Sequence, residues 1–113
     1  MALQKEIELE NGVVLNYHRI TSLNKITNIS NNIEISSYTN EHQREKEYEY
    51  QQVQLKNIAG EELTEEEQQL LNNGINVFIN TTFLQLPYDE SQTIEEAYEY
   101  LKETDKFSGS RDI

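Results

Sequence analysis

The fold of this chain is set by residues 3–20, which read Leu3-Gln4-Lys5-Glu6-Ile7-Glu8-Leu9-Glu10-Asn11-Gly12-Val13-Val14-Leu15-Asn16-Tyr17-His18-Arg19-Ile20. The first part alternates Leu3, Lys5, Ile7 and Leu9 with Gln4, Glu6, Glu8 and Glu10. A period of two is typical of a half-buried strand. Asn11-Gly12 follows as a turn signal, and a second run rich in apolar residues comes after it. This stretch predicts an antiparallel hairpin.

Two registers are open to this hairpin. A two-residue loop at Asn11-Gly12 sets Glu8 opposite Leu15 and mixes the two faces of the hairpin. A three-residue loop, residues 10–12, keeps the apolar side chains together by pairing Leu9 with Val13, Ile7 with Leu15 and Lys5 with Tyr17. Because a slip of one residue exchanges the faces, burial favours the three-residue loop. Gly12 is then expected in the left-handed conformation of the bulge.

The middle of the chain is more polar. Ser30-Asn31-Asn32 reads as a turn, since these side chains bond their own backbone, and residues 33–38 alternate again as a third strand. Residues 40–58 carry mixed charge and read as a polar arm or a mobile loop, which glutamate and lysine would protect from non-specific pairing. Within them, an extended strand that crosses from solvent to core is suggested by Tyr48, Tyr50, Val53 and Leu55.

The last third contains two helix signals. Thr64 with Glu67, and Thr93 with Glu96, have the spacing of a capping box. The first predicts a helix of about two turns that stops at Gly74. The second predicts a helix over residues 93–105 whose apolar stripe is Ile94, Ala97, Tyr98 and Leu101. Residues 75–86 between them read as a buried strand that Pro87 ends. Phe107 is expected to pin the end of the last helix.

These elements predict an α+β fold in a single domain over residues 1–107, with residues 108–113 as a flexible tail. Its antiparallel sheet is an N-terminal meander plus one later strand. A short helix and a C-terminal amphipathic helix pack on one face. Only 35% of the 113 residues are apolar, so the core should be thin, with one face of the sheet covered.

The formal net charge of −12 argues against direct binding of nucleic acid, because that binding depends on Lys and Arg neutralising phosphates. It equally disfavours anionic membrane surfaces. A basic protein partner is compatible with it. Cysteine is absent, which excludes disulfides and thiolate chemistry. The N-terminal residues contain no apolar signal segment, and the chain is expected to be made in the cytoplasm.

No combination of residues predicts catalysis, a cofactor or a metal site. His18 and His42 are far apart in the sequence, and His18 is expected to be solvated on the polar face of the second strand. Glu65-Glu66-Glu67 lacks the alternating ligands of a calcium loop. The remaining kind of functional site is a protein-binding surface, and tyrosine is favoured in such interfaces. The candidate interface residues are Tyr48, Tyr50, Val53 and Leu55, and their alternative role is packing along their own sheet.

Residues 9–20, residues 35–38, residues 76–81 and the helix segment 97–102 together resemble a group of short phage and prophage proteins. These share a Tyr-His-Arg-Ile stretch after an early hairpin, which is residues 17–20 here. The resemblance covers most of the chain except residues 40–73. It implies a non-enzymatic virion component, in the tail or baseplate, that is made in the bacterial host and contacts other virion proteins or copies of itself. An acidic inhibitor of a host nucleic-acid enzyme is the alternative that the charge supports.

Overall fold

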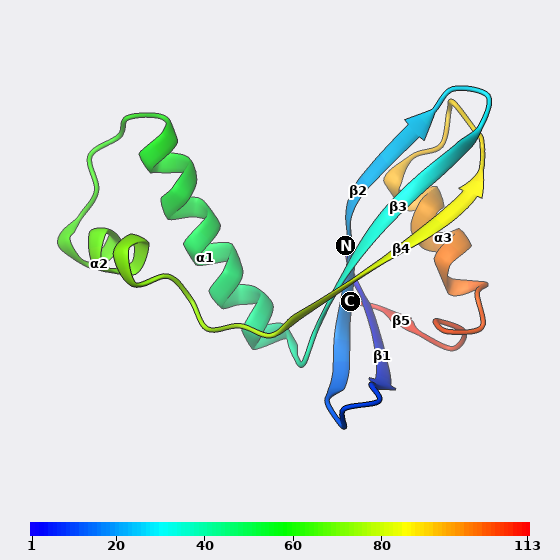
Figure 1. Ribbon diagram of the computed structural model, residues 1–113, viewed down its shortest axis with the longest axis horizontal. Coiled ribbons are helices and arrows are strands. Elements are labelled where there is room, and N and C mark those ends of the chain that lie inside the picture. Colours follow the sequence, from blue (N-terminus) through cyan, green and yellow to red (C-terminus); the bar gives the residue numbers. More distant parts are fainter.

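The computed structural model describes residues 1–113 and shows an α+β fold around one five-stranded antiparallel sheet (Figure 1). The strands lie in the order β4-β3-β2-β1-β5, so the first three form the expected meander. The elements in chain order are β1 (Leu3–Glu8), β2 (Val14–Ile26), β3 (Ser30–Tyr38), α1 (Glu41–Ile58), α2 (Glu65–Asn73), β4 (Ile79–Pro87), α3 (Ile94–Lys102) and β5 (Arg111–Asp112).

The β1–β2 hairpin has the three-residue loop that burial favours. Ile7 lies opposite Leu15, the amide of Leu9 donates to the carbonyl of Val13 at 2.8 Å, and Gly12 has a φ of +86°. The expected pairing of Lys5 with Tyr17 is wrong. An irregularity between Gln4 and Ile7 shifts the register, so that Gln4 lies opposite Tyr17.

The turn between β2 and β3 lies three residues earlier than expected. Asn28 has a φ of +60° there, and Ser30, Asn31 and Asn32 belong to β3. The turn prediction for these three residues is therefore wrong. Asn31 is fully buried because distant backbone and side chains satisfy its amide: Nδ2 donates to the carbonyl of Asp89 at 2.8 Å and to Oε1 of Gln92 at 2.7 Å.

β4 is an edge strand and is paired only with β3. Tyr38 lies opposite Ile79 at one end of this ladder, and Ser30 lies opposite Pro87 at the other. The prediction of a buried strand over residues 75–86 is wrong about where the strand begins and about its burial. Pairing starts at Ile79, and Leu86 alone among the β4 residues is buried. The strand does end at Pro87, as expected.

One face of the sheet is covered by α3, whose N-cap Thr93 accepts a hydrogen bond from the amide of Glu96 at 3.2 Å. Ala97, Tyr98 and Leu101 are buried, whereas Ile94, which was expected in the same stripe, is 42% exposed and does not belong to the core. The core is therefore a single layer between sheet and helix. Its members are Leu3, Ile20, Ile33, Ile35, Leu86, Ala97, Tyr98, Leu101 and Phe107.

The chain end, expected to be a flexible tail, lies against the sheet. Arg111 pairs with Gln4 and Asp112 pairs with Leu3, and the amide of Ile113 donates to the carbonyl of Ala2 at 3.0 Å. Phe107 is buried, as predicted. It holds the segment that returns the chain from α3 to this edge.

Candidate protein-interaction site

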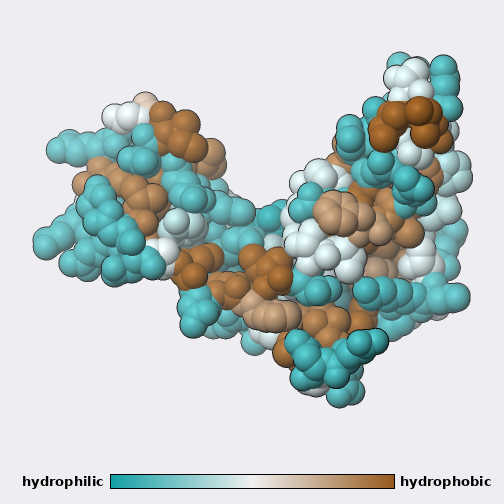
Figure 2. All heavy atoms as spheres, viewed as in Figure 1, coloured by the Kyte–Doolittle hydropathy of each residue, from teal (hydrophilic) through white to brown (hydrophobic).

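The most distinctive surface of the molecule is a helical arm, residues 41–73, formed by α1 and α2. It stands away from the sheet as a separate lobe (Figures 1 and 2). The Cα radius of gyration is 16.4 Å, whereas a compact chain of this length is expected near ~13 Å. The arm accounts for this elongation.

The helix α1 corrects the prediction of an extended arm or loop over residues 40–58. Its N-cap Asn40 accepts a hydrogen bond from the amide of Gln43 at 3.0 Å. The residues that follow are mostly Glu, Gln, Lys and Arg, which lose little side-chain entropy in a helix. A helix that is polar almost all round gives no periodic apolar signal, but Asn40 with Gln43 has the spacing of a cap and could have revealed its start.

The arm is held to the sheet by four polar side chains, which we call the arm anchor: Arg19 on β2, Tyr38 on β3, and Arg44 and Glu47 on α1. Oε1 of Glu47 accepts a hydrogen bond from the Tyr38 hydroxyl at 2.6 Å and one from Arg44 at 2.9 Å. Arg19 lies 3.4 Å from the same oxygen and donates through Nε to the Tyr38 hydroxyl at 3.1 Å. One carboxylate oxygen thus joins both arginines and the tyrosine.

Burial makes this cluster more than a surface ion pair. Tyr38 is fully buried and Glu47 is 9% exposed. Burial raises the pKa of Tyr38, and the hydrogen bond to Glu47 raises it further. Burial lowers the pKa of Arg19, but Tyr38 and Glu47 outweigh that effect and the net pKa is raised. The hydroxyl therefore stays protonated, and the guanidinium stays charged, at neutral pH.

The two helices of the arm pack through a small contact. Val53 is 5% exposed, and α2 has no buried residue. Thr64 and Glu67 form the predicted capping box, with both reciprocal hydrogen bonds at 3.1 Å. Glu67 also lies 2.7 Å from Nζ of Lys56, an ion pair that joins α2 to the end of α1.

The four candidate interface residues all fall on α1 but do not share a face. Tyr48 and Leu55 are 53% and 57% exposed, and they lie seven residues apart along one side of the helix. Val53 is buried and Tyr50 is partly buried. Ile58, 81% exposed, continues the side of Tyr48 and Leu55. We call Tyr48, Leu55 and Ile58 the arm face. Ile58 was not among the predicted interface residues, because it shares a side with Tyr48 only in a helix and not in an extended strand.

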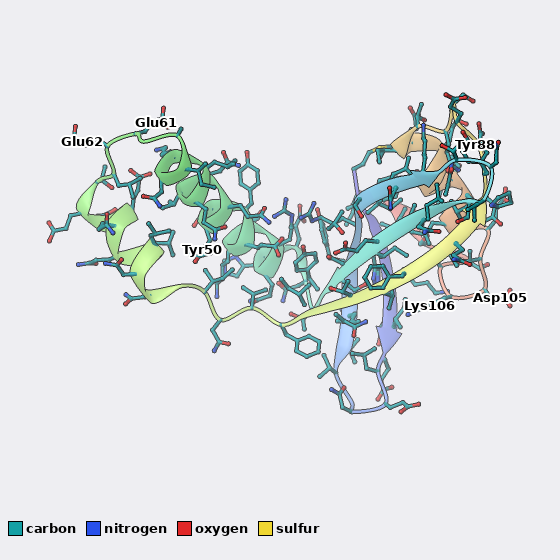
Figure 3. The ribbon with its side chains drawn as sticks, turned by 45° about the horizontal axis from the view of Figure 1, so that its top comes forward. Tyr50, Glu61, Glu62, Tyr88, Asp105 and Lys106 are labelled. Atoms are coloured by element: carbon teal, nitrogen blue, oxygen red, sulfur yellow. The ribbon has the colours of Figure 1, made fainter.

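The tip of the arm is acidic. Glu61, Glu62, Glu65 and Glu66 are all exposed. Figure 3 shows Glu61 and Glu62 at the turn between the helices, at the end farthest from the sheet. Lys56, the nearest cation on α1, is already paired with Glu67. Four of the 21 acidic residues of the chain are therefore exposed together at this end of the arm.

His18 corrects the expectation of a solvated side chain, because it is fully buried between β1, β3 and Phe107. Its Nε2 lies 2.8 Å from the carbonyl of Lys5, which can only accept, so Nε2 carries the proton. Nδ1 then accepts from the Ser37 hydroxyl at 2.7 Å. Burial lowers the pKa of His18, and the charge on Lys106 adds to this effect.

We therefore expect the free energy of unfolding to decrease as the pH is lowered through the unfolded-state pKa of histidine, about 6.5. There the unfolded chain takes up a proton that the buried, neutral His18 does not. One such proton lowers the free energy of unfolding by at most about 1.4 kcal/mol per pH unit, until the folded pKa is reached. Urea unfolding between pH 7 and 5 should show a shallower dependence in His18→Gln than in wild type. Equal slopes for the two proteins would contradict the assignment.

Two further features bear on binding. No group of three or more His, Asp or Glu side chains comes together in a way that could hold a metal ion. Among the helices, none combines the length and the apolar character needed to cross a membrane.

Comparison with known proteins identifies no relative from which a function for this site could be inferred. No protein-family model, no curated protein and no solved structure matches the chain.

Proposed function

We propose that this chain is a non-enzymatic structural protein of a phage or prophage, a tail or baseplate component that acts through protein–protein contacts of its arm. The observation that supports this proposal most directly is the arm itself. It is a helical projection whose direction is fixed by the arm anchor and whose outer residues are not used by the fold of the chain.

The distribution of burial supports a contact role for the arm. Of the helical residues in α1 and α2, only Glu47 and Val53 are buried. Holding two helices in one direction costs conformational entropy, and the small contact between them returns little apolar burial. A partner that covers the arm face would supply the missing burial, since a few exposed aromatic and aliphatic side chains carry most of the energy of such contacts.

The resemblance to phage and prophage proteins supports the identity of the assembly. The segments that carry this resemblance fall mainly in β2, β3, β4 and α3, which build the sheet and its covering helix, and residues 40–73 lie outside it. A common sheet with a distinct arm suits subunits that share a place in a particle and meet different neighbours. The partners proposed are other virion proteins or further copies of this chain.

This function is tested by photo-crosslinking in cells that carry the gene in its native setting. p-Benzoylphenylalanine in place of Tyr48 is expected to link the chain to a discrete protein of the purified particle. The same group in place of Lys46 is the control, because two residues turn it about 200° away from Tyr48 on the helix. If the chain is missing from particles purified by density gradient, the structural role is wrong.

The acidic arm tip favours one second candidate, an acidic inhibitor that binds the nucleic-acid site of a host enzyme. Four neighbouring exposed glutamates can meet a basic surface, and such binding weakens as salt is added. Under this alternative, the paired change Glu61→Gln and Glu62→Gln should weaken binding to a purified host polymerase or nuclease at low salt. Binding that these changes and salt leave unaltered would remove this alternative.

A further inference from the structure

The outer edge of β4 is a second unpartnered surface, separate from the arm. β4 is the terminal strand of the sheet and spans nine residues. A free strand edge exposes unpaired N–H and C=O groups that can pair with another strand. The opposite edge of the sheet is different. β5 has two residues, both charged, and covers only Leu3 and Gln4 of β1, and three of the four remaining β1 residues are charged.

β4 lacks the usual devices that prevent strand pairing. Charged residues make up 27% of the chain, yet the sequence of β4, INTTFLQLP, contains none. Its pairing with β3 is regular over all nine residues, whereas the β1–β2 and β2–β3 ladders each contain a register shift. Natural edge strands are commonly protected by charges, bulges or prolines, and only Pro87, at the last position, is present here.

The side chains of β4 are complementary to a second copy of the same strand. Phe83 is its central residue and is 75% exposed. In an antiparallel pair centred there, Phe83 meets its own copy. On the same face Thr81 meets Gln85, and on the other face Thr82 meets Leu84. We propose that two copies of this chain pair through β4 about a two-fold axis at Phe83, and that the two sheets become one.

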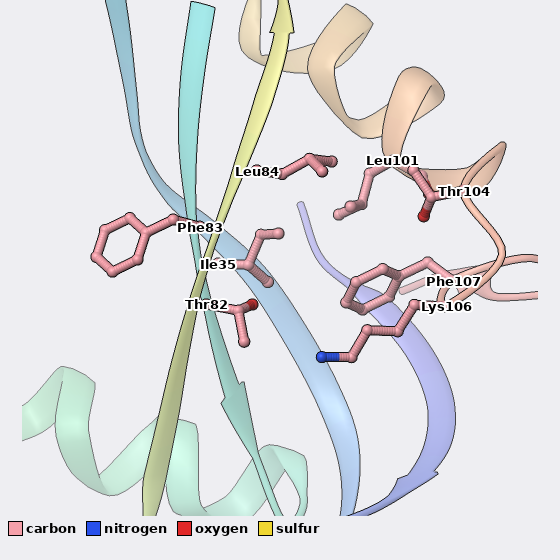
Figure 4. A pocket seen from close by; sticks show the side chains of 8 residues that line it. All are labelled: Ile35, Thr82, Phe83, Leu84, Leu101, Thr104, Lys106 and Phe107. Atoms are coloured by element: carbon pink, nitrogen blue, oxygen red, sulfur yellow. The ribbon is translucent and has the colours of Figure 1, made fainter.

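A hollow beside the edge fits this pairing. It has a volume of about 290 Å³ and is lined mainly by apolar side chains, among them Leu84, Leu101 and Phe107 (Figure 4). Thr82 and Leu84 point into it, and Phe83 points to the opposite side of the sheet. In the proposed pair, Leu84 of the second copy lies opposite Thr82 and covers this hollow. Strand addition of this kind combines backbone hydrogen bonds with side-chain pockets.

Charge favours a second copy at this seam over other places on the molecule. Two chains of net charge −12 repel each other. β4 is the one long strand through which they can approach without placing like charges opposite each other. Antiparallel pairing sets the start of one β4 against the end of the other, so the two arms leave from opposite ends of the seam. Both arms then remain free for the contacts of the proposed function, on which this inference rests.

Disulfide trapping tests the register directly, because the chain has no cysteine of its own. In an antiparallel pair, opposite Cα atoms are about 4.5–5.5 Å apart, which a disulfide can span. Purified Phe83→Cys is therefore expected to form a linked dimer under mild oxidation. Thr81→Cys alone and Gln85→Cys alone are expected not to, because their equivalent positions lie four residues, about 13 Å, apart. An equimolar mixture of these two variants should link.

Sedimentation velocity over a range of concentrations gives the second readout. Wild type should show a monomer–dimer equilibrium, and Phe83→Glu should raise the dimer dissociation constant at least about tenfold by placing two carboxylates at the axis. Ile113→Glu is the matched control, since Ile113 is 50% exposed and lies next to β5, at the opposite edge of the sheet from the seam. A wild-type monomer at all concentrations, or equal linking of all three single cysteine variants, would overturn the pairing. Because these measurements use the purified chain alone, such a failure leaves the arm-mediated function standing.

Discussion

Replacing Phe107 by alanine is expected to lower the free energy of unfolding by about 3–5 kcal/mol, the range for truncating a buried aromatic side chain. Phe107 is 2% exposed and belongs to the core cluster. Its ring meets the ring of His18 edge-on, with centroids 5.1 Å apart. The core is a single layer without a second helix, so few neighbours can move in to fill the space that the ring leaves.

Chemical unfolding in urea measures this loss, followed by far-ultraviolet circular dichroism. The slope of the transition should stay close to that of wild type, because the surface exposed on unfolding changes little. Phe107→Leu is the graded variant and should lose clearly less, since it keeps most of the apolar volume. A loss below about 1 kcal/mol for the alanine variant would show that Phe107 does not hold the return from α3 to β5.

Replacing Glu47 by alanine is expected to free the arm from the sheet while the sheet remains folded. The change removes the acceptor shared by Tyr38, Arg19 and Arg44, and leaves two partly buried arginines close together without their carboxylate. Hydrogen bonds to charged groups each contribute about 1.5–3 kcal/mol, and breaking a buried pair leaves an uncompensated charge. With the solvent exposure of the arginines taken into account, we expect α1 to lose about 2–3 kcal/mol of local stability.

Hydrogen exchange resolved along the chain separates this local effect from global unfolding. Exchange in α1 should accelerate strongly, and exchange in β2 and β3 should change little. Small-angle scattering should show a broader distribution of distances as the arm samples more directions. Glu49→Ala is the matched control on the same helix, since Glu49 is exposed and makes no contact with the anchor. Unchanged protection of α1 in Glu47→Ala would contradict the role of the anchor.

The parts of the fold that local chemistry determines could be predicted from the sequence. The alternation in residues 3–9 with Gly12 gave the first hairpin and its loop length. The capping boxes at Thr64 and Thr93 gave the starts of α2 and α3. In each case a signal within four residues matches a local hydrogen bond or turn that the structure contains.

The parts that depend on distant residues could not be predicted. Asn31 has the local propensity of a turn residue, but Asp89 and Gln92 satisfy its amide within the sheet. The alternation of residues in the second strand predicts that His18 lies on the polar face. The register shift between Gln4 and Ile7 and the position of Phe107 bury it instead. The arm was missed because α1 meets its partners through ion pairs and hydrogen bonds, which leave no hydrophobic period in the sequence.

Tyr38, at the end of β3, lies opposite Ile79, at the start of β4. Residues 39–78 leave the sheet and return to it at adjacent points, so they form an insertion within a single β3–β4 hairpin. The entropy of closing a loop grows only slowly with its length, so a short turn could replace the whole excursion and leave the five strands in place. Length changes and exchanges of binding specificity are thus expected to concentrate in this insertion, on a scaffold that need not alter.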